Sequence, residues 1–97
     1  MLCRMEKHIE AYLVKRVKEL GGIAYKFVSP ARRGVADRLV VLPGGVVWFV
    51  EVKTEKGRLS PLQKIFAADM ERLSQNYICL WSKQQVDGWI NEIRISL

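Results

Sequence analysis

The stretch from Gly34 to Lys53 constrains the fold more than any other part of the chain. Two apolar runs flank a Pro-Gly-Gly turn, and the second run ends in Glu51-Val52-Lys53. Apolar runs of this length, separated by turn residues, predict a β-hairpin. Charged residues at the open end of an apolar strand pair are costly unless they are paired, solvated or bound to a metal. This hairpin is therefore the first place to look for chemistry.

The length of the hairpin turn decides which charged residues share a face. A two-residue turn at Gly44-Gly45 would send the carboxylates of Asp37 and Glu51 to opposite faces. A three-residue loop that begins at Pro43 sets them directly across from each other, with Cβ atoms roughly 5 Å apart. The longer loop suits its residues, because Pro fits the first turn position and Gly can adopt the left-handed conformation. Lys53 lies two residues beyond Glu51 and shares its face.

Two carboxylates beside a lysine favour metal-assisted phosphate chemistry. Carboxylate oxygens are preferred ligands of hard divalent cations such as Mg²⁺ and Mn²⁺. The neighbouring Lys53 can orient or activate a water, or stabilise negative charge that builds on a phosphate. Phosphodiester hydrolysis needs this combination. A general-acid pair for glycoside hydrolysis fits poorly, because Lys53 would keep both acids ionised.

The charge balance points to a polyanionic partner. The 97 residues include sixteen Lys and Arg against ten Asp and Glu, which gives a formal charge of +6. Such a balance on a small domain favours nucleic acid. Only two cysteines, Cys3 and Cys79, and one His make a disulfide framework or a zinc site improbable. With no signal-peptide core and no membrane-length apolar run, we expect a cytoplasmic, intracellular protein.

The remaining pattern predicts one α/β domain spanning residues 1–97. Its order is α-β-β-β-α-β-α, with a mixed central sheet that contains the hairpin and is flanked by helices. The expected elements are a helix over 5–20, a strand over 23–28, the hairpin over 34–53, a helix from the cap Ser60 to about 74, a strand over 77–81 and a helix capped by Ser82. The middle helix is expected to bury a stripe of Leu62, Ile65, Phe66, Met70 and Leu73.

Three further residues have two open interpretations each. Glu6 and Glu10 lie four apart, so they are neighbours on the first helix and either border the site or are exposed helix acids. Gln63 either closes a capping box with Ser60 or turns its amide toward the acidic site.

Basic residues around the hairpin are candidate DNA contacts. An Arg-Arg pair in the loop before the hairpin could grip phosphate, since guanidinium matches phosphate oxygens bidentately, although solvated arginines are equally compatible with the sequence. The candidates are Arg32, Arg33, Arg38, Lys56, Arg58 and Lys64.

Four pieces in order resemble a known nuclease family. They are Glu6-X-X-Ile9, Gly34-Val35-Ala36-Asp37, Glu51-Val52-Lys53 and Gly57-X-Leu59-Ser60-Pro61-X-Gln63. This pattern, which extends over nearly the whole chain, resembles the VRR-NUC branch of the PD-(D/E)XK nuclease superfamily. One departure is Ala36, where the family usually carries Pro; it removes a backbone restraint but no ligand.

The resemblance implies a restriction-endonuclease-like fold and a set of site residues. Asp37 and Glu51 would ligate Mg²⁺ or Mn²⁺, with the backbone carbonyl of Val52 as a further ligand. Lys53 would be the catalytic lysine.

The resemblance also implies supporting residues and a class of substrate. Glu6 and Gln63 would support the site, with Glu10 as the alternative helix acid. Stand-alone members of this size are similar to viral or phage nucleases that act as homodimers on branched DNA, including four-way junctions. Two alternatives stay open: a flap or nicking endonuclease, and a non-catalytic DNA-binding module. Divalent-metal dependence of cleavage separates the enzymes from the module.

Overall fold

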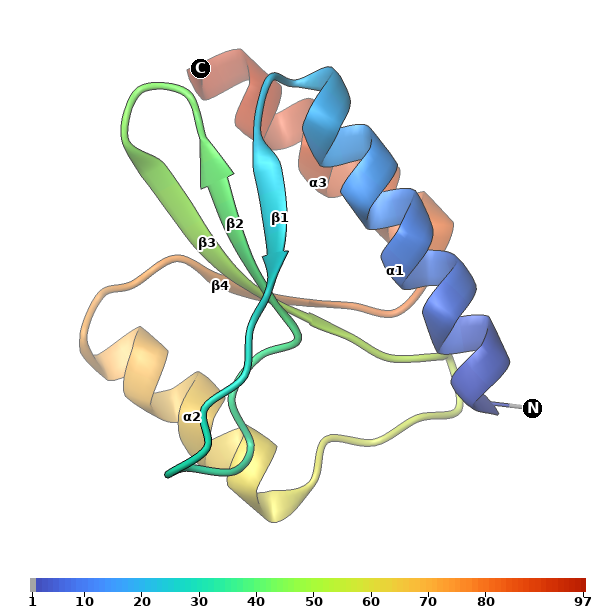
Figure 1. Cartoon of the computed structure of the whole chain (residues 1–97), viewed down its shortest axis with the longest axis vertical. Coiled ribbons are helices and arrows are strands. Elements are labelled where there is room, and N and C mark those ends of the chain that lie inside the picture. Colours follow the sequence, from blue (N-terminus) through green and yellow to red (C-terminus); the bar gives the residue numbers. More distant parts are fainter. Residues whose placement is uncertain (1) are drawn as a thin grey trace.

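The computed structural model describes the backbone of residues 2–97 and the side chains of residues 5–97. Its elements follow the predicted order α-β-β-β-α-β-α (Figure 1). They are α1 (Leu2–Glu19), β1 (Ile23–Lys26), β2 (Arg38–Leu42), β3 (Val46–Val52), α2 (Pro61–Arg72), β4 (Tyr77–Leu80) and α3 (Lys83–Ser96). Within residues 2–97, no helix is long and apolar enough to cross a membrane.

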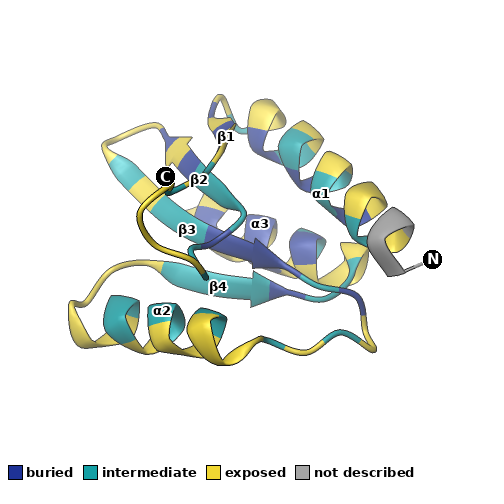
Figure 2. Ribbon diagram, turned by 60° about the horizontal axis from the view of Figure 1, so that its bottom comes forward, coloured by how far each residue is buried: buried dark blue, intermediate teal, exposed yellow. Residues whose placement is uncertain are grey.

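The four strands form one mixed sheet in the order β1-β2-β3-β4. The first three strands are antiparallel neighbours, and β4 runs parallel to β3. Helices α1 and α3 lie together on one face of the sheet, and α2 lies on the other (Figures 1 and 2). The predicted fold class, an α/β core built on a hairpin with flanking helices, is confirmed.

The main core lies between the sheet and the pair of helices α1 and α3. Alternate residues of each strand point toward this pair, as the period of two in a strand requires. The dark ribbon segments of Figure 2 mark this layer. Its buried members are Ile9, Leu13, Val17, Ala24, Val40, Leu42, Val50, Val52, Leu80, Val86, Trp89, Ile90 and Ile93. The opposite residues of each strand, including Glu51 and Lys53, therefore face the α2 side.

The first strand is shorter than the expected 23–28. It ends at Lys26, although the N–H of Phe27 still donates to the carbonyl of Asp37 at 3.0 Å. Beyond it the chain turns away at Pro30, which has no N–H for a further ladder bond. The other ends agree with expectation or differ from it by one to four residues, the largest difference being the hairpin start at Arg38.

The prediction that α2 buries a full apolar stripe is wrong. None of its residues is buried, and Leu62, Ile65 and Leu73 are 47%, 52% and 50% exposed. Only the half-buried Phe66 packs into an aromatic group on the sheet, with ring centroids 5.8 Å from Phe49. Because α2 lies alone on its side of the sheet, the remainder of its stripe has no second helix to pack against.

Candidate functional site

The hairpin has the register that the three-residue loop predicts. Leu42 pairs with Val46, and both glycines of the loop have left-handed backbone, with φ of +81° and +77°. The last ladder pair is Arg38 with Val50, so the next pair outward is Asp37 with Glu51. The two carboxylates thus face each other across the open end of the hairpin.

Asp37 is fixed by a bond to the opposite strand. Its Oδ2 accepts a hydrogen bond from the backbone N–H of Val52 at 2.8 Å. The loop that delivers Asp37 depends on Gly34, which has φ of +83° and lies so close to Leu62 that an added Cβ would come within 2.6 Å of backbone. Only glycine fits there, which explains the Gly in the Gly-Val-Ala-Asp motif.

Glu51 is almost completely buried, with 2% exposure. Burial, and after it the adjacent Asp37 carboxylate and its hydrogen bond, raise the pKa of this carboxyl to about 8 against the opposing effect of Lys53. The ammonium Nζ of Lys53 lies 3.9 Å from Glu51 Oε2. One lysine at this distance does not balance two adjacent carboxylates, so the site favours a proton or a cation.

Gln63 both closes the capping box with Ser60 and contacts the acidic pair. Its Oε1 accepts from the backbone N–H of Ser60 at 2.8 Å, and its own N–H donates to the Ser60 hydroxyl at 3.2 Å, which completes the capping box. Because the amide oxygen is used by the cap, the amide nitrogen points the other way and donates to Glu51 Oε2 at 3.3 Å. The cap of α2 therefore orients a side chain that contacts the acidic pair.

The structure separates the two acids of α1. Glu6 is half-buried, and its charge contributes to the raised pKa of Glu51, so it lies toward the acidic pair. Glu10 instead forms ion pairs with Arg38 at 2.6 Å and with Lys26 at 3.4 Å. The charge of Glu6 therefore acts on Glu51, whereas Glu10 has a different set of partners.

The donors at this site fit a hydrated Mg²⁺ or Mn²⁺. Among the side chains of residues 5–97, no three His, Cys, Asp or Glu residues gather closely enough to form a complete cage. Mg²⁺ normally keeps several waters and binds through one or two carboxylates, which the Asp37–Glu51 pair supplies. A structural zinc site needs four nitrogen or sulfur ligands and does not fit.

The nearby thiol takes no part in this arrangement. Cys79 is the strand neighbour of Glu51 on β4 and is a free, half-buried cysteine. Burial raises the pKa of the Cys79 thiol to about 12, so it stays protonated at neutral pH. The second cysteine, Cys3, lies outside the described side chains.

Five of the six basic residues expected to contact DNA are exposed, and the sixth, Arg38, forms an ion pair within the protein. Arg32 and Arg33 line a groove of about 410 Å³ against α2. The exposed residues are Arg32, Arg33, Lys56, Arg58 and Lys64. The sixth candidate, Arg38, is half-buried on the α1 side, where its guanidinium contacts Glu10 and donates to the carbonyl of Ala24 at 3.0 Å.

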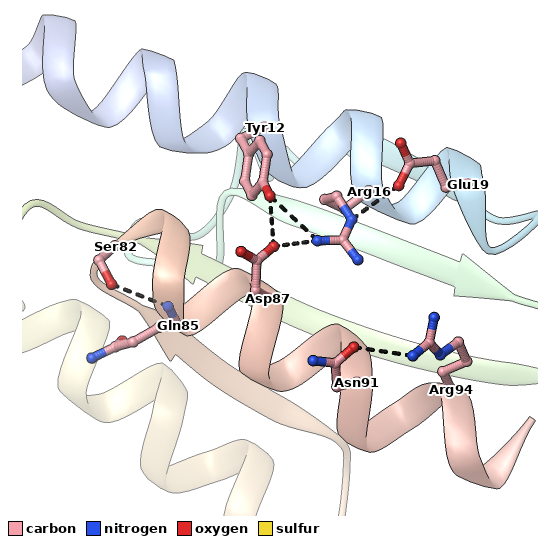
Figure 3. A network of polar contacts seen from close by, with 8 residues as sticks. All are labelled: Tyr12, Arg16, Glu19, Ser82, Gln85, Asp87, Asn91 and Arg94. Carbon is pink, nitrogen blue, oxygen red and sulfur yellow. Dashed lines mark hydrogen bonds and ion pairs between the residues drawn. The ribbon is translucent and has the colours of Figure 1, made fainter.

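A polar network that sequence reasoning missed joins the two helices behind the sheet. Tyr12 donates to Asp87 at 2.6 Å, and Arg16 forms an ion pair with the same carboxylate (Figure 3). The guanidinium of Arg16 also pairs with Glu19 at 2.9 Å. These contacts hold α1 to α3 on the face of the sheet away from Glu51, so we assign them a structural role. The contacts of Tyr12 and Arg16 with Asp87 join residues more than 70 positions apart, so they left no local signal.

A hairpin that presents an Asp, a buried Glu and a Lys within a mixed sheet defines a PD-(D/E)XK-like core. No family model matches the chain. A solved structure described as a VRR_NUC domain superposes with a TM-score of 0.85 at 35% identity, over 90% of this chain and 95% of that one. "Putative nuclease p44" of Acyrthosiphon pisum secondary endosymbiont phage 1 is 49% identical over 78 residues, which are 80% of this chain and 84% of that protein. The chain therefore belongs to the VRR-NUC family, and it is a nuclease.

Proposed function

We propose that this nuclease is a divalent-metal-dependent endonuclease that cuts branched DNA as a homodimer. The single observation that carries the metal dependence is the buried Glu51 facing Asp37 at the end of the hairpin, with its pKa raised to about 8. Asp37, Glu51 and the carbonyl of Val52 would hold Mg²⁺ or Mn²⁺. The ion supplies charge that polarises the scissile phosphate.

The protein's own groups then position the water and the strand. Lys53, beside Glu51 on the same face, orients the attacking water and offsets charge that builds on the phosphate. Gln63 fixes the Glu51 carboxylate through its amide. Glu6 adds negative charge near the carboxylates that would hold the cation. The exposed Arg32, Arg33, Lys56, Arg58 and Lys64 provide positive charge for the DNA backbone.

Cleavage assays on labelled DNA test this function directly. Four-way junction, 5′-flap, 3′-flap and linear duplex are each incubated with Mg²⁺, Mn²⁺ or EDTA. We expect paired symmetric nicks on the junction with either metal and none with EDTA. Preferential cutting of a flap would support a metal-dependent endonuclease whose substrate is a flap instead of a junction. Tight DNA binding without metal-dependent cutting of any substrate would contradict the proposal and favour a non-catalytic module.

The uncovered half of the α2 face supports the homodimer. The ladder aligns Ile23, Val41 and Val47 across three strands on this face, and each is more than one-third exposed. The apolar side chains of α2, Leu62 and Ile65 among them, are exposed on the same side of the sheet. Exposed apolar groups of this kind are typical of an interface.

Leu62 and Ile65 also border the groove that Arg32 and Arg33 line, so the expected interface lies beside that groove. A second copy seated on the α2 face would bring two sites together for two nicks.

Ile65→Lys should dissociate the dimer, because it places a charge in the apolar face. Ile95→Lys is the matched control, since Ile95 is 88% exposed on α3, on the other side of the sheet. Sedimentation velocity over a range of concentrations should give a dimer for the parent and for Ile95→Lys, and a monomer for Ile65→Lys. A parent that stays monomeric at about 100 µM, or two variants that dissociate alike, would rule out this interface.

A further inference from the structure

An ion pair close to the acidic pair has no part in the function proposed so far. Glu10 Oε2 accepts from Arg38 Nε at 2.6 Å, and the two side chains are only 15% and 19% exposed. Arg38 is held at a second point by the carbonyl of Ala24, and the Lys26 ammonium lies 3.4 Å from the same Glu10 oxygen. A charge-assisted bond with this little water around it is geometrically well defined.

The partners of this ion pair adjoin two site residues. Arg38 directly follows Asp37 at the start of β2. Glu10 lies one helical turn after Glu6, about 6 Å along the axis of α1. The bond between Glu10 and Arg38 therefore ties the helix that carries Glu6 to the strand end that carries Asp37.

The packing of apolar side chains in the core does not by itself fix the position of Glu6. Within the described side chains, Ile9 is the first buried residue of α1, and Met5 is 54% exposed. Among the described side chains of α1, Glu6 thus lies on the N-terminal side of the first buried apolar residue, Ile9. The Glu10–Arg38 bond is a polar anchor immediately next to it, and a site carboxylate must be held to within about 0.5 Å to act.

We propose that Glu10 and Arg38 are positioning residues that hold Glu6 against the Asp37–Glu51 pair and so raise the affinity of the site for its divalent cation. This inference depends on the proposed metal-dependent function. It assigns Glu10 a role next to the site without contact with the cation, and it assigns Arg38 a role inside the protein in place of a DNA contact.

Mn²⁺ binding by the protein without DNA tests the proposal. Isothermal titration calorimetry should show that Glu10→Gln and Arg38→Gln each weaken Mn²⁺ binding by about tenfold, the lower end of the losses known for partners that orient a metal site. Asp87→Asn is the matched control, because it removes another ion pair of α1 on the side of α3. It should lower the unfolding midpoint in urea and leave Mn²⁺ affinity unchanged.

A double-mutant cycle separates positioning from general stability. If Glu10 acts through Glu6, then Glu10→Gln should cause no further loss of Mn²⁺ affinity in a Glu6→Gln background. Additive losses, an unchanged affinity in Glu10→Gln, or an equal loss in Asp87→Asn would each overturn the positioning role. A parent protein that binds no Mn²⁺ and cuts no DNA would overturn the proposed function as well. A parent that binds Mn²⁺ and cuts DNA, together with a Glu10→Gln variant of equal Mn²⁺ affinity, would overturn only the positioning role.

Discussion

Asp37→Asn should lower the rate of DNA cleavage by at least about a thousandfold, because it removes one of two carboxylate charges from the proposed metal site. The fold should persist, since an Asn carbonyl oxygen can still accept the hydrogen bond from the N–H of Val52. Single-turnover cleavage with saturating Mg²⁺ measures the rate, and far-UV circular dichroism with urea unfolding measures the fold. Glu92→Gln, at an exposed acid of α3, is the control and should cut at the parental rate. Parental cleavage by Asp37→Asn would refute the site.

Measuring both the cleavage rate and the Mn²⁺ affinity of Lys53→Ala separates the role of the lysine from that of the carboxylates proposed to bind the metal. We expect a loss of at least about a hundredfold in cleavage rate, because the positive charge near the phosphate is gone. Mn²⁺ affinity should not fall, since Lys53 donates no ligand and its ammonium competes with a cation for Glu51. A variant that loses metal binding together with cleavage would show that Lys53 acts by holding the site in shape.

Glu51→Gln should stabilise the metal-free protein while it abolishes cleavage. The pKa of Glu51 is raised from its ordinary 4.5 to about 8 in the folded state. The folded protein therefore binds an extra proton between these pH values, and the parental stability falls as pH rises through that window. At pH 8 and above, Glu51→Gln should exceed the parent by roughly 2 kcal/mol or more, since each unit of pKa shift corresponds to 1.36 kcal/mol. Near pH 4.5 the two proteins should be equally stable.

Thermal unfolding in EDTA at several pH values checks this expectation. A gain of that size raises the midpoint by about 8 °C or more for a domain of this length. Mg²⁺ should stabilise the parent at pH 8 and have little effect on Glu51→Gln, because ion binding replaces the proton on Glu51. Glu71→Gln, at an exposed position of α2, is the control and should show no such pH dependence. Identical midpoints for the parent and Glu51→Gln from pH 4.5 to 9 would contradict the raised pKa.

The arrangement of the acidic pair followed from the sequence because it depends on local spacing. The Pro-Gly-Gly loop fixes how the two strands pair, and a strand repeats its side-chain direction every two residues. Those two rules are enough to bring Asp37, Glu51 and Lys53 to one face. The capping box of α2 was equally local, because Ser60 and Gln63 are three residues apart.

Tertiary structure alone decided the features that depend on contacts between distant segments. The choice between Glu6 and Glu10 depends on how α1 lies over β2, and the partner of Arg38 comes from 28 residues away. The raised pKa of Glu51 depends on how deeply neighbouring elements bury its side chain, and the residue pattern of the strand does not predict that depth. The apolar stripe of α2 predicted burial that the structure does not show, because a stripe does not reveal whether another element is present to cover it. Local periodicity thus determined the elements and the register, and the packing of distant segments determined burial, charge pairing and which apolar side chains the chain leaves exposed.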